Sequence, residues 1–210
     1  MNNSVVNTAR LLSAGLRALL VLTVLTGILY PLAVTGVAQA LFGNKANGSE
    51  VKAEGKVVGS SLIGQQDYSL DYFQPRPANG LGENPVNTQY KLILSGATNR
   101  SADNPELIKW VKEAKAKVVK ENSTADYKVR PSEVPADAVT SSGSGLDPNI
   151  SPAYAELQVH RVAERNDLSV TQVEKLVEDH IQGRTLGFMG EPRVNLLELN
   201  VALKELAAKS

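Results

Sequence analysis

The stretch ALLVLTVLTGILYPLAVTGVAQALFGN, residues 18–44, carries no formal charge and lies between Arg17 and Lys45. An α-helix rises about 1.5 Å per residue, so about 20 apolar residues cross the hydrocarbon core of a bilayer. The stretch is therefore long enough to cross, and it is too long for a typical buried helix of a soluble domain. It predicts one transmembrane helix at residues 18–44. Pro31 removes one backbone hydrogen bond and predicts a kink in this helix, which membrane helices tolerate.

A cleaved signal peptide is the alternative interpretation of the same stretch. Arg10 and Arg17 give it a basic start without acidic residues, and Ala38-Gln39-Ala40 has the small-x-small form of a cleavage site. The apolar run is longer than the roughly 7–15 residues of a signal-peptide core. The length therefore favours a retained anchor.

The two flanks of the helix differ in length more than in charge. Residues 1–17 form a short tail that holds Arg10 and Arg17, whereas the segment after the helix mixes lysines with glutamates. A short basic tail before a first helix usually stays in the cytoplasm, and long domains cross the membrane largely regardless of charge. We therefore expect a cytoplasmic tail at 1–17 and an extracytoplasmic domain at 45–210. A cleaved signal would leave that domain outside as well.

The composition excludes several classes of function. Lysine plus arginine equals aspartate plus glutamate at 22 each, whereas a nucleic-acid binder needs a net positive face to displace counterions from phosphates. Cysteine is absent, which excludes disulfides, thiolate nucleophiles and cysteine-ligated metals. His160 and His180 fall on different predicted helices, and neither Glu156 nor Glu164 stands at a spacing that indicates a shared metal site. We predict no catalytic residue, no metal ligand and no cofactor-binding residue in this chain.

Local signals place four helices after residue 104. The predicted caps are Asn104, Ser151, Ser169 and Asn195, each followed by proline, Gln or Glu in the first turn. Gly183 is expected to end the third helix. Strands are predicted at 57–65 and, from a period of two, at 86–94. The predicted fold class is a single N-terminal transmembrane α-helix plus one α+β extracytoplasmic domain.

The segment SSGSGLDP, residues 141–148, resembles two kinds of functional loop. A glycine loop before a helix can bind a phosphate, but here an acid and a proline follow where a phosphate loop needs lysine and then Ser or Thr. A serine nucleophile needs a base, and Ser141, Ser142 and Ser144 do not stand in a Gly-x-Ser-x-Gly pattern. A structural turn is the favoured interpretation, with the Asp147 carboxylate hydrogen-bonded to nearby backbone N–H groups.

Two arginines are held by neighbouring prolines. Arg76 stands between prolines in PRP, and Arg193 follows proline in EPRVN. Rigid backbone lowers the entropy lost when a side chain makes a fixed contact. Each arginine is predicted to form either a buried structural ion pair or an anchor at an interface with another chain, and the sequence leaves both open.

Six segments together resemble one family, the KdpC subunit of the bacterial Kdp potassium-transporting ATPase. They occur in the family's order and cover nearly the whole chain: YPLAVTGVAQALF (30–42), GSSLIGQ (59–65), YFQPRP (72–77), SGATN (95–99), SSGSGLDPNISPAYAELQVHRVA (141–163) and GRTLGFMGEPRVNLLELN (183–200). The chain departs from the family at residues 100–103, where a Leu-Gly-Pro stretch is usual, and at His160, where proline is common.

The resemblance implies a single-pass subunit in the cell (inner) membrane. Its implied partners are the potassium-conducting subunit, the P-type ATP-hydrolysing subunit and a very small peptide subunit, besides the lipid bilayer. The resemblance also implies that ATP serves the complex and that this chain promotes its use. An extracytoplasmic domain at 45–210 does not reach cytoplasmic ATP, so no ATP-binding residue is assigned here.

Three functions follow as hypotheses. The leading one is a non-catalytic accessory subunit of an ATP-driven potassium uptake complex. The second is a membrane-anchored nucleotide-binding regulator that acts on the cytoplasmic side. The glycine–serine loop at residues 141–145 suggests this hypothesis. The third is an anchored exoplasmic hydrolase that uses a serine of 141–144.

Overall fold

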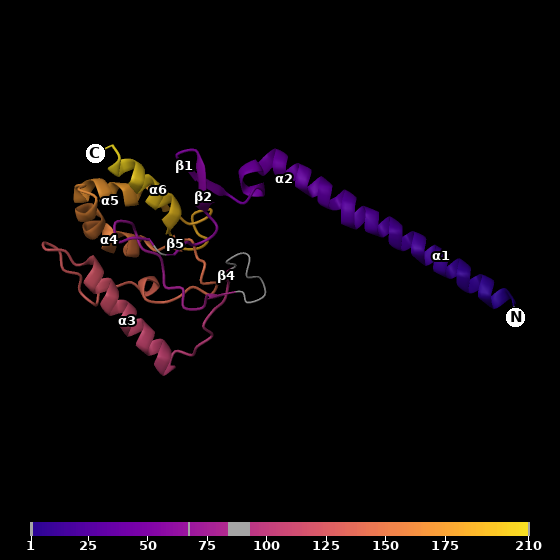
Figure 1. The fold of residues 1–210 in the computed structure, drawn as a ribbon, viewed down its shortest axis with the longest axis horizontal. Helices are drawn as coiled ribbons and strands as arrows, with labels where there is room; N and C mark the ends of the chain where they lie inside the picture. The colour runs from indigo at the N-terminus through magenta and orange to yellow at the C-terminus, as the bar shows by residue number, and fades with distance from the viewer. Residues whose placement is uncertain (1, 67, 84–92, 210) are drawn as a thin grey trace. The chain divides into compact units, whose positions relative to one another are not determined.

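The computed structural model describes residues 2–66, 68–83 and 93–209 (Figure 1). The chain divides into two compact units, Met1–Glu50 and Val51–Ser210. We call them the anchor unit and the folded unit, and each is described by itself.

The anchor unit is a long apolar helix. It consists of α1 (Asn2–Val24), a π-helical turn η1 (Leu25–Leu29) and α2 (Tyr30–Ala46). Among the described residues, Ser4–Ala46 is the helix that is long and apolar enough to cross a membrane, and none of its apolar window is buried against protein. Its 43 residues extend for about 65 Å, roughly twice the hydrocarbon thickness of a bilayer. The predicted single apolar helix is confirmed, and it also includes the predicted tail.

The helix adapts to Pro31 by widening one turn. The N–H of Tyr30 donates to the carbonyl of Leu25, five residues back, in a π-turn that ends directly before the proline. A proline ring in a regular α-helix clashes with the carbonyl four residues earlier, here in the widened turn. The backbone leaves helical angles at Phe42 (φ −137°, ψ 38°). The kink predicted at Pro31 itself stays a prediction.

The folded unit contains the four predicted helices. They are α3 (Pro105–Asn122), α4 (Pro152–Arg165), α5 (Val170–Asp179) and α6 (Leu196–Ala207). In each, the predicted cap side chain accepts a hydrogen bond from its own first turn: Asn104, Ser151, Ser169 and Asn195. The capping box at the start of α5 is also present. These signals act within one helical turn, which is why the local sequence identified them.

The end predicted for α5 at Gly183 is wrong. The helix ends at Asp179, with His180 at the C-cap, and the His180 ring Nδ1 lies 2.7 Å from the carbonyl oxygen of Leu176. Residues Ile181–Gln182 form strand β6 instead. Pairing of β6 with a strand from later in the chain competes with further helix, and that pairing lies outside any local pattern.

The strands of the folded unit are short and form small antiparallel sheets. They are β1 (Glu50–Ala53) beside β2 (Lys56–Ser60), β3 (Gly82–Glu83) beside β4 (Ile93–Leu94), and β5 (Asn149–Ile150), β7 (Arg193–Asn195) and β6 in the order β5-β7-β6. A 3-10 turn, η2 (Ala136–Ala138), precedes β5. Of the strand predicted at 86–94, residues 86–92 lie outside the described residues. The predicted α+β class is confirmed for the folded unit.

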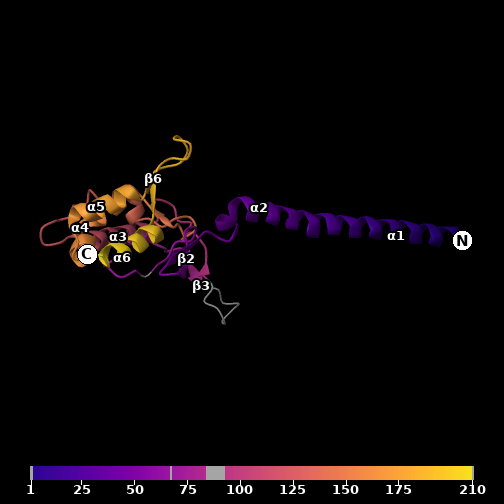
Figure 2. The same cartoon turned by 90° about the horizontal axis from the view of Figure 1, so that it is seen from above.

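The core lies between the helices and the three-stranded sheet. α4 packs on both α3 and α5, and α5 packs on α6 (Figure 2). The largest completely buried apolar side chains come from the strap described next, α4, α5, β7 and α6: Phe73, Val162, Val173, Val177, Val194, Leu199 and Leu203. α4 contributes the largest share of buried residues, which makes it the central helix of the unit.

A strap without regular secondary structure, residues 70–77, crosses these helices and is held by buried side-chain amides. Asn200 of α6 accepts from the N–H of Phe73 (2.9 Å) and donates to its carbonyl (3.0 Å). Gln158 of α4 does the same for Gln74, at 2.7 and 3.3 Å. The amides therefore replace the neighbouring strand that the strap lacks, and they satisfy backbone groups that burial would otherwise leave unpaired.

Candidate functional site

The loop at residues 141–149 connects several distant segments of the folded unit, and we call it the junction loop. The N–H of Gly64 donates to the carbonyl of Leu146 (2.8 Å), and the N–H of Gly96 donates to that of Ser144 (3.1 Å). The N–H of Leu196, at the start of α6, donates to the carbonyl of Pro148 (2.9 Å). Segments separated by more than a hundred residues in the sequence therefore meet at one loop.

Gly64 allows the closest of these approaches. A Cβ atom at this position would lie 2.5 Å from the carbonyl oxygen of Asp147 and 3.0 Å from the carbonyl carbon of Leu146. Both neighbours are backbone, so neither moves away easily. The glycine is needed here for space, because two backbones touch.

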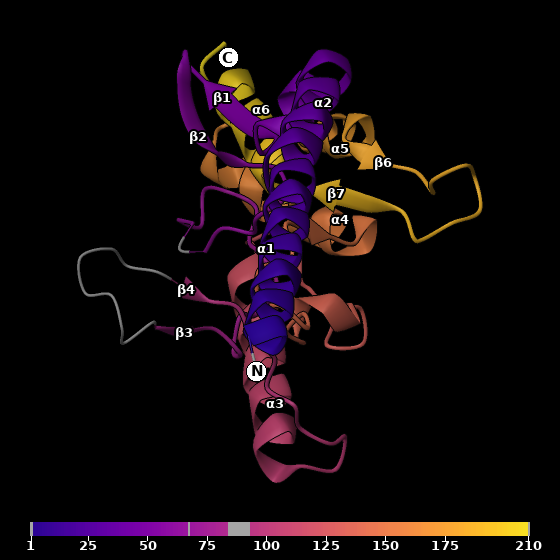
Figure 3. The same ribbon diagram turned by 90° about the vertical axis from the view of Figure 1, so that its right-hand side faces the viewer.

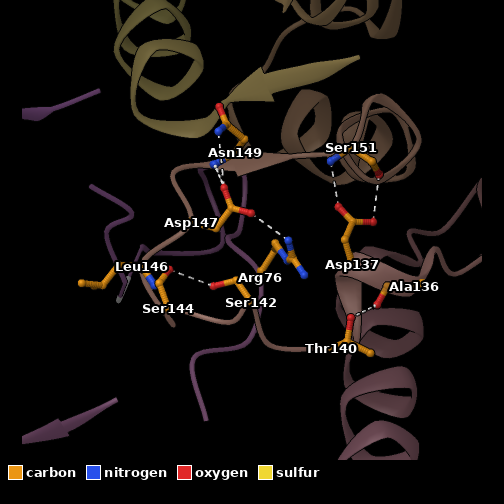
Figure 4. A network of polar contacts seen from close by, with 10 residues as sticks. All are labelled: Arg76, Ala136, Asp137, Thr140, Ser142, Ser144, Leu146, Asp147, Asn149 and Ser151. Atoms are coloured by element: carbon orange, nitrogen blue, oxygen red, sulfur yellow. Dashed lines mark hydrogen bonds and ion pairs between the residues drawn. The ribbon is translucent and has the colours of Figure 1, made fainter. Parts of the chain in front are cut away.

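Arg76 and Asp147 form an ion pair that fastens the strap to the junction loop (Figure 4). Arg76 Nη1 lies 2.7 Å from Asp147 Oδ2, and the side chains are 23% and 28% exposed. The other carboxylate oxygen, Oδ1, accepts from the backbone N–H of Asn149 at 3.0 Å. The structure thus shows Arg76 in an ion pair, as one of its two predicted roles requires, but the pair is partly exposed and not buried. The backbone hydrogen bond predicted for Asp147 is confirmed. An interface role for Arg76 stays a prediction.

A second carboxylate in Figure 4 anchors the start of α4. Asp137 accepts from the N–H of Ser151 at 2.7 Å and from its hydroxyl at 2.9 Å. The Ser151 oxygen in turn accepts from the N–H of Tyr154. A negative charge at a helix N-terminus is favourable. The Asp137 carboxylate therefore has a structural role at the start of α4.

The junction-loop serines are used within the fold. Ser141 Oγ accepts from the N–H of Asn79 (3.1 Å), and Ser144 Oγ accepts from the N–H of Leu146 (3.0 Å). The hydroxyl oxygens of Ser142 and Ser144 lie 3.4 Å apart. In the described part of the chain, no histidine nitrogen is among their partners. The N–H groups of Gly145 and Leu146 donate inside the loop, so they are not free to bind a phosphate. The geometry supports a structural turn.

The two histidines have separate local contacts. His160 stacks on Tyr127 with ring centroids 3.9 Å apart and planes 5° apart. It lines a hollow of about 740 Å³ together with four glutamates, at positions 133, 156, 174 and 178. Within residues 2–66, 68–83 and 93–209, no group of three His, Asp or Glu side chains has the geometry of a metal site.

Arg193 lies at the base of a hairpin. It begins β7, where it pairs with Gln182 of β6, and its side chain is partly exposed. Among the described residues, none forms a hydrogen bond or an ion pair with the Arg193 guanidinium, whereas the Arg76 guanidinium pairs with Asp147. The interface role predicted for Arg193 is not tested by this geometry and stays a prediction.

A double-mutant cycle on Arg76→Met and Asp147→Asn is expected to give a coupling free energy of about 1 kcal/mol, which added salt reduces. Asparagine keeps the oxygen that accepts from Asn149, so the cycle isolates the ion pair. The measurement is urea unfolding of the full chain in detergent, followed by the fluorescence of Trp110. A coupling near zero at low salt would show that the pair positions the loop without stabilising it.

Comparison with known proteins extends the resemblance to the whole chain. The family described as "KdpC: K+-transporting ATPase, c chain" matches residues 12–205. A protein of Streptomyces avermitilis named "Potassium-transporting ATPase KdpC subunit" is 72% identical, over 100% of both chains. Proteins of the same name from Streptomyces coelicolor (66% identical, 99% of this chain and 98% of the other) and Mycobacterium tuberculosis H37Rv (47%, 94% and 99%) are also similar. The chain therefore belongs to the KdpC family, the c chain of the K+-transporting ATPase.

Proposed function

We propose that this chain is a non-catalytic accessory subunit of an ATP-driven, high-affinity potassium uptake complex. It stabilises the assembly and promotes ATP use by the P-type subunit. The observation that carries the proposal is the family match over residues 12–205, which covers both the membrane-length helix and the folded unit. The junction loop supports it, because its serines and its one carboxylate, Asp147, are engaged in structural contacts.

We further propose the topology that the short basic N-terminal tail and the long following domain favour. Residues 1–17 lie in the cytoplasm, residues 18–44 cross the cell membrane, and residues 45–210 lie outside. The partners are the potassium-conducting subunit, the P-type subunit and the small peptide subunit. With this topology the folded unit acts on ATP use indirectly, by biasing the equilibrium between two states of the complex through the anchor helix or through a partner.

Single-cysteine labelling tests the topology directly, since the chain contains no native cysteine. A membrane-impermeant maleimide is expected to label Lys209→Cys in intact cells and to label Thr8→Cys after lysis. Both positions are exposed in the structure. Labelling of Lys209→Cys only after lysis would place the folded unit in the cytoplasm and overturn the proposed topology.

Co-purification tests the proposed role. The affinity-tagged full chain, expressed with the other subunits, is expected to retain the potassium-conducting and P-type subunits in mild detergent. Omitting this chain is expected to reduce recovery of their complex with each other and to lower potassium-stimulated ATP hydrolysis. Loss of all association with the tagged chain would count against an accessory subunit.

A further inference from the structure

The hairpin between β6 and β7, residues 183–192, presents an apolar tip that the folded unit does not cover. It projects away from the helices in two views (Figures 2 and 3). Leu186 is 79% exposed, Phe188 72% and Met189 52%. The first two are the most exposed large apolar side chains among the described residues of Val51–Ser210. We call residues 184–191 the hairpin tip.

The hairpin tip has a defined shape. The N–H of Thr185 donates to the carbonyl of Met189 (2.9 Å), and the N–H of Met189 donates to that of Thr185 (3.0 Å). An ion pair between Arg184 and Glu191, 2.9 Å apart, closes the base. These contacts define the backbone from which Leu186, Phe188 and Met189 project.

The shape includes one unfavourable backbone conformation. Leu186 has φ +55°, whereas Gly187 and Gly190, at φ +81° and +78°, adopt angles that glycine tolerates. A leucine in the left-handed region is uncommon, and such residues concentrate at functional sites where the surroundings hold them. The tip therefore keeps both strain and exposed apolar area, and neither stabilises the isolated chain.

Two kinds of surface take up exposed apolar side chains: a bilayer and an apolar pocket on a protein. Binding to a fluid bilayer becomes stronger with the apolar area that is buried and does not require a fixed shape. Loops that bind anionic lipid also carry unpaired basic residues. Here Arg184, the one basic residue of the tip, is paired with Glu191, and the other basic residue of the hairpin, Arg193, lies at its base, away from the apolar tip. Shape that is fixed in advance lowers the entropy lost on binding to a matching pocket. The geometry favours the protein pocket.

We propose that the hairpin tip inserts into an apolar pocket on the extramembrane surface of another subunit of the same ATPase, with Phe188 and Leu186 as its anchors. This inference rests on the proposed accessory function. Arg193, at the base of the hairpin, then lies at the polar rim of the contact, where arginine is common.

Site-specific photo-crosslinking in the assembled complex tests the inference. A photoreactive benzoylphenylalanine replaces Phe188 in the full chain, and the same residue at Ile108, which is 40% exposed on α3, is the control. A covalent adduct of the Phe188 variant with another subunit, absent from the Ile108 control, is the expected result. Adducts with lipid or with a second copy of this chain, or no adduct in a complex that still co-purifies, would overturn the hairpin proposal and leave the accessory function standing.

Substitution gives an independent readout. Phe188→Ser is expected to weaken association of the full chain with its partner by about 30-fold, the effect of losing one strong anchor. Ile108→Ser is expected to change it less than about 3-fold. Because Phe188 is exposed, the unfolding midpoint of the free chain is expected to stay unchanged. Equal effects of the two substitutions on association would contradict the proposal, and failure of the unmodified chain to associate would remove both the proposal and the accessory function.

Discussion

Replacing Arg161 with methionine is expected to lower the free energy of unfolding of the folded unit by about 3–5 kcal/mol. Arg161 is 2% exposed. Its guanidinium donates to Asn122 Oδ1 (2.9 Å), Gln158 Oε1 (2.7 Å), the carbonyl of Tyr72 (2.9 Å) and the carbonyl of Leu70. Methionine fills similar volume but removes the donor of Asn122 Oδ1 and of the Leu70 carbonyl, and each unsatisfied buried group costs roughly 1–3 kcal/mol. Gln158 Oε1 and the Tyr72 carbonyl each lose one of two donors and keep the one from Gln74.

The matched control is Arg165→Met, one turn later on α4. Arg165 is 49% exposed and pairs with Asp71 at 3.3 Å. Its removal is expected to change the free energy of unfolding by less than about 1 kcal/mol. Urea unfolding of the full chain in detergent, followed by Trp110 fluorescence, measures both. If the two substitutions lowered the free energy of unfolding by similar amounts, burial of the Arg161 guanidinium would not be the cause of its effect on stability.

The effect of Arg161 has a defined pH dependence. Burial lowers the pKa of Arg161 from the ordinary value of an arginine to about 10. Below pH 10 the side chain is protonated in both the folded and the unfolded chain, so its contribution to stability does not vary there. Above that pH the unfolded chain binds more protons, and this group alone would then make stability rise with pH. The loss in Arg161→Met is therefore expected to be constant across the neutral range.

The helices of this protein could be predicted because their signals are local. Asn104 and Ser151 precede proline, Ser169 and Gln172 form a capping box, and each acts within one turn. The apolar anchor could be predicted for a different reason, since its length alone sets it apart from soluble helices. The end of α5 could not be predicted, because it depends on pairing with a strand more than ten residues later.

The buried polar network was not predicted, although one indication was present in the sequence. Gln158 and Arg161 stand three residues apart on α4, on the same side as the apolar residue Tyr154, and Asn200 lies between leucines of α6. Polar side chains on an apolar face indicate buried hydrogen bonds. Their partner, the backbone of the strap, lies more than eighty residues away in the sequence and has no pattern of its own. The partner could be identified only from the fold.

In the candidate site, too, local signals could be predicted and partners distant in the sequence could not. Proline neighbours correctly singled out Arg76, but the sequence did not identify Asp147 as its partner, and it left Arg193 with the same two alternatives. The exposed tip at Leu186 and Phe188 was also not predicted, because a short apolar group in a loop is equally compatible with burial. Exposure depends on what the rest of the chain leaves uncovered.

Gly64→Ala is expected to lower the free energy of unfolding by about 3 kcal/mol, the upper part of the usual range for overpacking. The added methyl would lie 2.5 Å from the carbonyl oxygen of Asp147, so the two backbones must separate. Separation lengthens the hydrogen bond from Gly64 N–H to the Leu146 carbonyl, now 2.8 Å, and moves the carboxylate that Arg76 contacts. Substitution of one hydrogen therefore disturbs the junction between three segments.

Gly143→Ala, in the junction loop itself, separates this steric effect from a general effect of glycine replacement. A methyl group at position 143 meets no atom within 4 Å, and the backbone there does not need a positive φ. Its substitution is expected to leave stability within about 0.5 kcal/mol or to raise it slightly, because alanine restricts the unfolded chain. Urea unfolding of both full-length variants in detergent makes the comparison. If the two alanines had equal effects, the close contact at Gly64 would not be what holds the junction loop in place, and the loop would have to be ordered by the Arg76–Asp147 pair instead.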